Sequence, residues 1–371
     1  MKVFVLLIFL FLFFRINPFI VLPNQKNGLL SKEVIKIGLL VQDNSAVEAI
    51  QAAELAVKEA NMAGGIDGHP VKLVVRTMEG PWGTGSKQAV DMIFSEKVWA
   101  IIGSHDGRNA HLVEQVATKS RQVFVSAWSA DPTLSQAFVP WFFNCIPTDR
   151  QQAQAFVAEI YQKRKLNKIL LVQDETYDSK KAAENFIKTV KNNNKQEPYI
   201  ISLKHPLPGK DSLMEQIAVK NVEAIILLLE PSSAVQIIKR IIKSNQKQVV
   251  FCNLSTMGEN GIQISGIQSV NEFVVIDVFG SRSAQFNNFQ ANFVKTYNKK
   301  PGAVALYAYD AVKLVMGAIK KSKLNRDQLR DALSEMNYEG ITGTIRFDEK
   351  GNRIGNPGLV EIKKGRSVLL H

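Results

Sequence analysis

The sequence is poor in cysteine and histidine. Among 371 residues there are two cysteines, Cys145 and Cys252, and five histidines. Each cysteine lies in an apolar segment, which predicts two buried thiols that act as small hydrophobic side chains. A disulfide between them stays open as the alternative, because export would permit one. The first cysteine comes only at position 145, which argues against a bacterial lipoprotein anchor near the N-terminus.

Recognisable catalytic motifs are also missing. The stretch GPWGTGSK at 80–87 is close to a phosphate-binding loop, but Lys87 is shifted by one position and Gln88 replaces the hydroxyl that would bind Mg²⁺. His111 and Glu114 lie three residues apart without the second histidine of a zinc protease motif, and no nucleophile elbow accompanies the histidines. We therefore expect no enzyme, no catalytic residue, no bound metal and no cofactor.

The charge balance is strongly basic, with 46 Lys and Arg against 34 Asp and Glu and a net charge of +12. A nucleic-acid partner would need these cations gathered on one face and interleaved with aromatic side chains. Instead they are scattered along solvated helix faces, for example Lys180, Lys181, Lys188, Lys191 and Lys195. We expect no nucleic-acid partner, and adhesion to an anionic envelope surface is the alternative reading of the charge.

The N-terminus carries a long apolar run. Lys2 precedes an uninterrupted apolar block at 3–14, which Arg15 follows. This pattern is typical of a secretory signal, and the block is short for a membrane span of about 20 residues. Because no A-x-A cleavage site is evident and the next residues are again apolar, residues 1–25 are predicted to be either a signal peptide or a retained N-terminal anchor. Either one predicts a periplasmic or other extracytoplasmic location.

Residues 34–78 contain the repeating unit of the predicted fold. The run VIKIGLLV predicts a strand, and the next segment places apolar residues on one helical face, namely Ala46, Ala49, Ile50, Ala53, Val57 and Ala60. Ser45 and Glu48 form the pattern of a capping box at the helix start. Two glycines at 64–65 predict the helix end, Asp67-Gly68 predicts a turn, and VKLVVRTM predicts a second strand. A strand–helix–strand unit of this kind predicts a parallel sheet.

The same alternation continues along the chain in two series, separated by the segment WFFNCIPTD. Strand-like runs such as WAIIG, VFVS, KILLVQ, EAIILLL and VVFCN alternate with segments of helical periodicity. The chain is too long for one typical core. The predicted fold class is therefore α/β, with two doubly wound parallel-sheet units in tandem and antiparallel pieces at TGTIRFDEKGNR and LVEIKKGRSVLL.

Several segments resemble a known family. One match lies in the first crossover and is carried by Glu59, Asn61, Gly64, Gly65, Ile66, Gly68 and Pro70. Others are WAIIGSHDGRNAH, VFVSAWSADPTLS, WFFNCIPTDRQQA, LLVQDETYDSKKA and YAYDAVKLVMGAI. In order and spacing, from about Val34 to Leu370, the chain resembles the type I periplasmic binding proteins of the leucine/isoleucine/valine-binding group, which are ABC transporter substrate-binding proteins.

The resemblance implies two lobes joined by three crossing segments, near 145–149, 275–281 and 347–353. Lobe 1 would comprise residues 34–147 and 280–346, and lobe 2 residues 148–279 and 347–371. A ligand would bind in the cleft between the lobes, where open parallel sheets present the carboxyl ends of their strands. Hinge closure of the lobes is the expected response to ligand, and a monomer is the expected assembly.

Loops at the carboxyl ends of the predicted strands supply the candidate ligand-binding residues. The loop at 103–109 opens a helix and offers free backbone N–H groups, which suit an anionic or carbonyl oxygen. The alternative role of Trp82 is to pack its own loop. The alternative role of Arg108 is that of a solvated or ion-paired residue at a helix start. The full candidate set is Trp82, His105, Asp106, Gly107, Arg108, Ser126, Trp128, Ser129, Tyr177, Glu230 and Leu254.

The sequence departs from its relatives at the positions that hold an amino acid. Amino-acid binders of this family use two hydroxyl positions and an acidic position for the α-carboxylate and α-ammonium, and here Gly107, Ala130 and Leu254 occupy them. We expect weak or absent leucine binding, because an unpaired buried ammonium is costly. Neighbouring polar groups that could substitute are Ser126, Ser129, Asp106 and Glu230.

The resemblance implies an extracytoplasmic solute-binding protein. It would capture a small polar or amphipathic molecule, amino-acid-like or an amide, and present it to an ABC transporter permease. The alternative is a sensory ligand-binding protein that signals to a membrane partner. Nothing after Leu370 encodes a membrane span or a signalling segment, which would favour transport.

Overall fold

The computed structural model describes residues 32–136, 139–204, 210–244, 247–259, 261, 272–278, 283–364 and 366–370. The chain divides into Met1–Lys32, of which only Lys32 is described, and Glu33–His371. The predicted signal peptide or anchor at 1–25 therefore lies outside the described residues. None of the described helices combines the length and the apolarity needed to cross a bilayer.

The first sheet consists of five parallel strands in the order β2-β1-β3-β4-β5. Its strands are β1 (Ile35–Val41), β2 (Val71–Thr77), β3 (Ala100–Ser104), β4 (Val123–Ser126) and β5 (Phe142–Asn144). Successive side chains of one strand enter different clusters: Leu39 belongs to the core that includes Ala53 of the α1 segment, and Leu40 to the core that includes Val113 of the α3 segment. Helices therefore cover both faces of this sheet.

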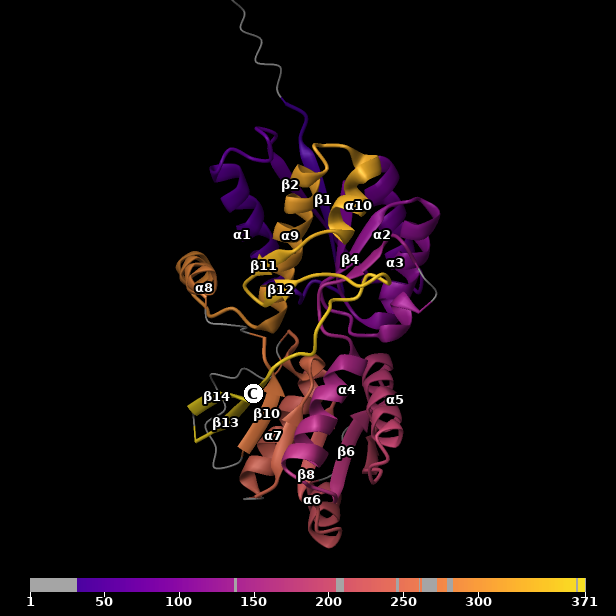
Figure 1. Cartoon of the computed structure of the whole chain (residues 1–371), viewed down its shortest axis with the longest axis vertical. Helices are drawn as coiled ribbons and strands as arrows, with labels where there is room; N and C mark the ends of the chain where they lie inside the picture. The colour runs from indigo at the N-terminus through magenta and orange to yellow at the C-terminus, as the bar shows by residue number, and fades with distance from the viewer. Residues whose placement is uncertain are drawn as a thin grey trace, which may run out of the picture. The chain divides into compact units, whose positions relative to one another are not determined.

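The helices around the first sheet come from two distant parts of the chain. One group precedes residue 120: α1 (Val47–Met62), α2 (Thr84–Val90) with its continuation η1 (Asp91–Ser95), and α3 (Gly107–Lys119). The other follows the second sheet: α8 (Ala284–Tyr297), α9 (Ala303–Lys321) and α10 (Leu329–Ser334), together with the hairpin β11 (Tyr338–Gly340) and β12 (Gly343–Ile345). Figure 1 shows α9 and α10 beside the strands of the first sheet, and α9 contacts α1 and β3. We call this assembly lobe 1.

The second sheet has seven strands in the order β14-β13-β10-β9-β8-β6-β7. Its parallel strands are β6 (Ile169–Asp174), β7 (Tyr199–Leu203), β8 (Ala224–Leu228), β9 (Val249–Cys252) and β10 (Glu272–Ile276). The antiparallel pair β13 (Leu359–Lys363) and β14 (Arg366–Leu370) extends one edge, as the sequence predicts for LVEIKKGRSVLL. The helices of this lobe 2 are α4 (Asp149–Val157) with η3 (Ala158–Lys163), α5 (Tyr177–Asn192), α6 (Lys210–Val219) and α7 (Pro231–Lys243).

The first crossover forms as the sequence predicts, except at its helix start. β1 and β2 pair in parallel, and Gly64 and Gly65 end α1 at positive φ angles of 93° and 75°. The side chain of Asn61 exchanges two 2.8 Å hydrogen bonds with the backbone of Val71, which fixes the helix end to the start of β2. This stretch therefore ends α1 and aligns the start of β2.

The predicted capping box at Ser45 and Glu48 is wrong. α1 begins at Val47 without a side-chain cap, and the N–H groups of Glu48 and Ala49 donate to Oε1 of Glu259 at 2.7 and 3.1 Å. Glu48 instead accepts a hydrogen bond from the Gly302 N–H at 3.0 Å. A carboxylate distant in sequence has taken the role of the local cap, which satisfies the same helix N–H groups.

The two lobes are joined by three crossing segments, which confirms the predicted fold class. The crossings connect β5 to α4, β10 to α8 and β12 to β13. The first and third run side by side, because Asn144 N–H donates to Gly351 O at 2.8 Å and Arg353 N–H donates to Asn144 O at 3.1 Å. Part of the second crossing, at 279–282, lies outside the described residues, and so does the lobe boundary expected at 279–280.

A buried polar network fixes the third crossing to lobe 1. Arg353 donates to the carbonyl oxygens of Cys145 at 3.0 Å and Thr342 at 2.7 Å. Asp310 in α9 accepts hydrogen bonds from the N–H groups of Ile341 at 2.9 Å and Thr342 at 2.8 Å, and from the Thr342 hydroxyl at 2.6 Å. Because each buried polar group has partners, this network can hold the crossing in one conformation.

Both cysteines are buried free thiols, as the sequence predicts. Cys145 begins the first crossing and Cys252 ends β9, and both have no exposed surface. Burial raises the pKa of the Cys252 thiol to about 12 and that of Cys145 further, so both stay protonated and act as small apolar side chains.

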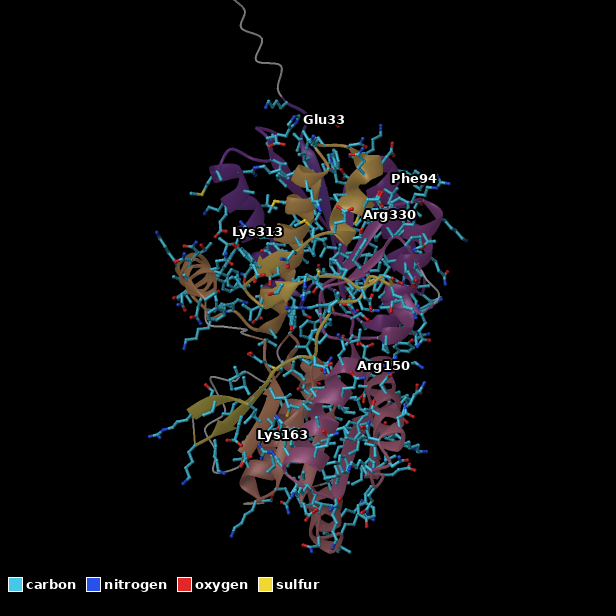
Figure 2. All side chains as sticks on the ribbon, in the orientation of Figure 1. Glu33, Phe94, Arg150, Lys163, Lys313 and Arg330 are labelled. Atoms are coloured by element: carbon cyan, nitrogen blue, oxygen red, sulfur yellow. The ribbon has the colours of Figure 1, made fainter. Side chains whose placement is uncertain are left out.

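Cationic side chains are distributed over many elements. Figure 2 labels Arg150, Lys163, Lys313 and Arg330, which belong to α4, η3, α9 and α10. Lys163 pairs with Glu159 at 3.5 Å, Lys313 pairs with Glu59 at 3.6 Å, and Arg330 pairs with Asp331. The cations are therefore dispersed over several elements, and the exposed pair of Arg330 and Asp331 is of the kind that contributes little to stability.

Candidate functional site

Loops from both lobes meet at the carboxyl ends of the parallel strands. They enclose a small cavity lined by Trp128 and Ala130 of lobe 1 and by Asp149, Asp178, Asn253, Leu254 and Ser255 of lobe 2. The centre of a water molecule can occupy about 10 Å³ within this cavity, so the cavity has room for about one water. Any larger molecule can enter only if the lobes separate here.

Two side-chain hydrogen bonds link the lobes beside this cavity, in addition to the backbone bond from the Asp149 N–H to Ala130 O at 2.7 Å. The Gly107 N–H of lobe 1 donates to Asp178 Oδ1 of lobe 2 at 2.9 Å, and the Tyr177 hydroxyl of lobe 2 donates to Asp131 Oδ2 of lobe 1 at 2.7 Å. A Cβ on Gly107 would lie 2.9 Å from both Asp131 Cβ and Asp178 Oδ1. Glycine at this position therefore permits the close approach of the two lobes.

The N-terminus of α3 is already satisfied by carboxylates. Asp106 caps the helix by accepting the Asn109 N–H at 2.8 Å, and Asp178 accepts the Gly107 N–H. The sequence predicts free N–H groups for a ligand oxygen at this loop. In the described conformation a side chain from the other lobe occupies that position, because α5 brings Asp178 to the start of α3.

Asp149 and Asp178 are enclosed carboxylates without a cationic partner among the described residues. Asp149 is only 6% exposed, and no described residue donates a hydrogen bond to its carboxylate. Burial raises its pKa well above the usual value, and the charges of Asp178 and Asp131 raise it further. Part of the Asp178 residue reaches solvent, but burial of its carboxyl and the nearby Asp106 raise its pKa to about 7.

Asp131 differs from these two because it has a cation. His111 Nε2 lies 3.2 Å from Asp131 Oδ2 and 2.9 Å from the Thr133 hydroxyl. The Asp131 contact, with help from Glu114, raises the pKa of His111 to about 9. Burial alone would raise the pKa of Asp131, but the hydrogen bonds from His111 and Thr133 outweigh it and lower the pKa to about 2. Asp131 and His111 therefore form a neutralised pair at pH 7.

Trp128 forms the aromatic wall of the cavity. Its ring contacts Tyr307 edge-on, with the ring centroids 6.4 Å apart. Ser126 and Ser129 lie behind it, both buried, and the Ser129 N–H donates to the Ser126 hydroxyl at 3.1 Å. The two serines hold the loop that carries Trp128, and Leu254, which is 1% exposed, supplies an apolar part of the opposite wall.

The structure brings together only part of the predicted site. Trp128 and Leu254 line the cavity, and Gly107 and Tyr177 form the lobe contacts beside it. Ser126 and Ser129 support Trp128, and Asp106 caps α3. Glu230 caps α7 by accepting the Ser233 N–H, which engages its carboxylate within lobe 2.

Three other predicted residues lie away from the cavity. His105 is 2% exposed and its ring stacks on Phe124 within lobe 1, where burial lowers its pKa and keeps it neutral. Trp82 is 64% exposed, and the Arg108 guanidinium lies 4.2 Å from its ring centroid. This cation–π pair leaves Arg108 on the surface, in the solvated helix-start role given above as its alternative.

The sequence interpretation missed the residues that give the cavity its charge. Asp149 follows the capping-box threonine of α4, and Asp178 is the second residue of α5, which begins at Tyr177. Both stand in segments that the sequence places at the lobe junction. Their meeting depends on how α4 and α5 start beside the same strand ends, which no single segment reveals.

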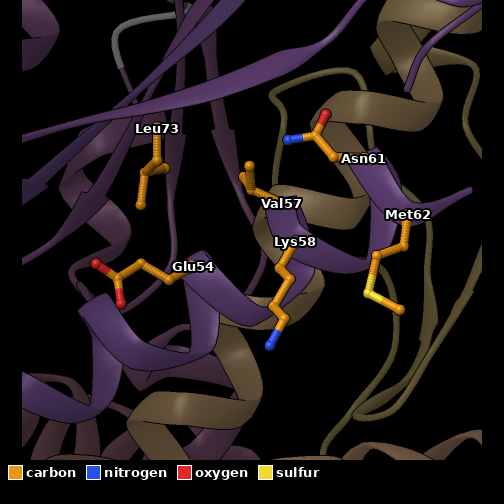
Figure 3. Close-up of a pocket in the computed structure, with 6 residues that line it drawn as sticks. All are labelled: Glu54, Val57, Lys58, Asn61, Met62 and Leu73. Atoms are coloured by element: carbon orange, nitrogen blue, oxygen red, sulfur yellow. The ribbon is translucent and has the colours of Figure 1, made fainter. Parts of the chain in front are cut away.

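A larger hollow lies elsewhere, on the surface of lobe 1. It measures about 550 Å³ and lies between α1 and β2 (Figure 3). Its lining is Glu54, Val57, Lys58, Asn61, Met62 and Leu73, and Met62 is 79% exposed. Because it is far from the carboxyl ends of the strands and bordered by exposed side chains, we do not assign ligand binding to it.

These features define a class of protein, the two-lobed α/β binding proteins with a cleft at the carboxyl ends of two parallel sheets. A family model described as periplasmic binding protein matches residues 34–366, and the chain belongs to this family, as the sequence predicts. A solved solute binding protein of an ABC transporter from R. palustris, in complex with benzoate, is 19% identical with a TM-score of 0.77, and the match covers 91% of this chain and 95% of that one. At that identity the likeness shows the fold alone.

Two curated relatives extend the comparison. Leu/Ile/Val-binding protein homolog 1 of Brucella abortus (strain 2308) is 24% identical over 342 residues, which cover 86% of this chain and 87% of that protein. Glutamate receptor 2.2 of Arabidopsis thaliana is 21% identical over 355 residues, 92% of this chain. The chain spans 37% of the length of that receptor.

Proposed function

We propose that this protein is an extracytoplasmic solute-binding protein of an ABC transporter. It takes a small polar or amphipathic molecule, amino-acid-like or an amide, into the cleft between its lobes and presents it to a permease as a monomer. The observation that carries the proposal is the meeting of Trp128, Asp149, Asp178 and Leu254 around one enclosed cavity at the strand ends of both sheets.

The mechanism requires the lobes to open and close. Opening breaks the hydrogen bonds Gly107–Asp178 and Tyr177–Asp131, and closing around a solute removes it from water. Crossings that run side by side near Asn144 and Gly351 supply the hinge. We propose lobe 1 as 34–147 with 280–346 and lobe 2 as 148–279 with 347–371, after a signal peptide or anchor at 1–25.

The experiment is native mass spectrometry of the exported protein, followed by small-angle X-ray scattering. We expect a co-purified small molecule of defined mass, and a smaller radius of gyration when that molecule is added back to protein stripped by mild denaturation. A protein without adduct, whose scattering profile no compound of a broad metabolite panel changes, would contradict the proposal.

The similarity to glutamate receptor 2.2 along 92% of the chain favours a second function, sensory binding. The same closure would then report a ligand to a membrane signalling partner. Reconstitution with a permease encoded beside this protein distinguishes the two: ligand-dependent ATP hydrolysis is expected for transport, and its absence together with ligand-dependent binding to a membrane kinase or receptor is expected for sensing.

A further inference from the structure

The cavity between the lobes is lined by two carboxyl groups that no cation among the described residues neutralises. Asp149 is nearly fully buried and lines the cavity without a hydrogen-bond donor among the described residues. Asp178 lines the same cavity, and its one described donor is the Gly107 N–H. None of the described Lys, Arg or His side chains forms an ion pair with either residue, whereas Asp131 nearby is neutralised by His111. Buried carboxylates of this kind are costly unless something positive compensates them.

Asp178 also supplies an anion where a ligand carboxylate would otherwise bind. Its Oδ1 lies 2.9 Å from the Gly107 nitrogen at the start of the 13-residue helix α3. A carboxylate on the ligand would have to displace Asp178 from this N–H and would face the charges of Asp149 and Asp178 together. A ligand with an ammonium and no carboxylate meets neither obstacle.

The remaining walls favour an organic cation. Trp128 adds an aromatic ring to the lining, a group that attracts ammonium ions, and Leu254 and Ala130 add apolar contact for a carbon skeleton. Asn253 and Ser255 add polar groups to the lining. Within the described ranges, no three His, Cys, Asp or Glu side chains are placed to hold one metal ion.

On the basis of the proposed solute-binding function, we propose that the cleft selects a small organic ammonium compound that lacks a free carboxylate, such as an amine or an amino-acid amide. Asp149 and Asp178 are its counter-charges, and Trp128 is its aromatic wall. Asp178 is a specificity residue: by occupying the start of α3 it rejects the zwitterionic amino acid with the same side chain.

The test uses compounds that share a side chain and differ in their charged groups. In the leucine series, leucinamide and 3-methylbutylamine are cations, leucine is a zwitterion and 4-methylpentanoate is an anion. In the aromatic series, the corresponding compounds are phenylalaninamide, 2-phenylethylamine, phenylalanine and 3-phenylpropanoate. Titration calorimetry on the stripped protein is expected to give at least tenfold tighter binding of the cations in one or both series. Equal or tighter binding of the carboxylates, or no binding by any cation, overturns the inference.

Three variants separate the roles of the carboxylates. Asp149→Asn is expected to weaken cation binding at least tenfold. Asp178→Gly frees the Gly107 N–H, so we expect the ratio of the affinity for the cation to the affinity for the amino acid to fall at least threefold. Glu184→Gln removes a charge from the exposed side of the same helix α5 and is the matched control, expected to change binding less than twofold. Circular dichroism melts establish that each variant is folded, and a cation preference unchanged in both aspartate variants contradicts the proposal.

The outcomes also distinguish this inference from the broader function. A co-purified molecule that carries a free carboxylate would contradict the proposed selectivity for ammonium compounds, but it would agree with the proposed solute-binding function. An absence of any co-purified molecule and of any contraction by the metabolite panel would remove the solute-binding function itself.

Discussion

Two buried carboxylates, Asp310 near the crossings and Asp149 at the cavity, lie in opposite settings. Asp310 has no exposed surface and accepts three hydrogen bonds from Ile341 and Thr342. Burial raises its pKa, but those hydrogen bonds and the charge of Arg353 act against the rise. Asp149 is buried almost as fully, and the neighbouring Asp178 and Asp131 add to the effect of burial on its pKa.

The difference separates a structural carboxylate from one available for recognition. A buried charge with a complete set of donors stabilises the conformation that supplies them, and removal of one partner is costly. A buried charge without donors destabilises the closed protein unless a ligand brings a positive group. We therefore expect the same substitution, loss of one carboxylate, to have opposite effects on stability at the two places.

The largest effect is expected for Asp310→Ala. It leaves two N–H groups, one hydroxyl and the nearby Arg353 without their anion, so we expect a loss of about 3–5 kcal/mol in the free energy of unfolding. Urea denaturation followed by circular dichroism measures it. Asp331→Ala removes an exposed carboxylate paired with Arg330 and is the control, with an expected change below about 1 kcal/mol. A loss as small as that control would contradict a structural role for Asp310.

The next effect concerns pH and Asp178. Its pKa is about 7 in the folded chain, raised by burial and by Asp106, Asp131 and Asp174, against an ordinary value of 3.8. Between pH 4 and pH 7 the folded state therefore binds a proton at Asp178 more tightly than the unfolded state does. The contribution of Asp178 to folding stability is greatest below pH 4 and declines as the pH rises towards 7. Asp178→Asn removes this decline.

We expect Asp178→Asn to be more stable than the native chain by about 2 kcal/mol at pH 8 and no more stable at pH 4. Each unit of the raised pKa corresponds to about 1.4 kcal/mol, and the expected gain is smaller than the whole difference in pKa implies because lobe opening rehydrates part of the charge. Denaturation curves at both pH values measure this. Glu259, whose pKa is also raised to about 7, is unchanged in the variant, so the comparison isolates Asp178. Parallel stability–pH curves for the two proteins would rule the mechanism out.

A smaller effect is expected for Gly107→Ala. The added Cβ would lie within 3.0 Å of Asp131, Asp178 and Ser129, so the lobes must separate slightly. We expect a loss of about 1 kcal/mol and a larger radius of gyration in X-ray scattering. Gly317→Ala, inside α9 with only the end of the Met336 side chain nearby, is the matched control and should leave the scattering unchanged. Identical profiles for both variants would show that Gly107 does not govern the approach of the lobes.

The smallest effect is expected for Trp82→Ala. The ring is 64% exposed and contacts Arg108 outside the cavity, so we expect a stability loss of about 0.5 kcal/mol and an unchanged ligand affinity. Trp128→Ala removes the cavity wall and is the comparison, with ligand binding weakened at least tenfold in calorimetry. An affinity lost equally in both variants would place Trp82 in the site after all.

Local sequence patterns predict the crossover and the sheets well, because they depend on residues close in sequence. Gly64 and Gly65 end α1, and β1 and β2 pair in parallel, as their periodicity and turn residues predict. The capping box at Ser45 fails because Glu259, more than 200 residues away, supplies the oxygen. Contacts between residues that are distant in sequence also limit prediction of the site.

Trp128 and Leu254 could be found as residues at strand ends, since that edge of a parallel sheet is known in advance. The negative charge of the cavity could not, because Asp149 and Asp178 become unpaired only when α4 and α5 start beside Trp128. His105 illustrates the converse: it follows β3 in a promising loop, yet its ring turns inward onto Phe124.

The most direct test measures stability and binding together in Asp149→Asn. We expect a free energy of unfolding equal to or above that of the native chain, with leucinamide bound at least tenfold more weakly. A variant that loses as much stability as Asp310→Ala, or binds leucinamide as tightly as the native chain, would show that Asp149 is a structural residue rather than a counter-charge for a ligand.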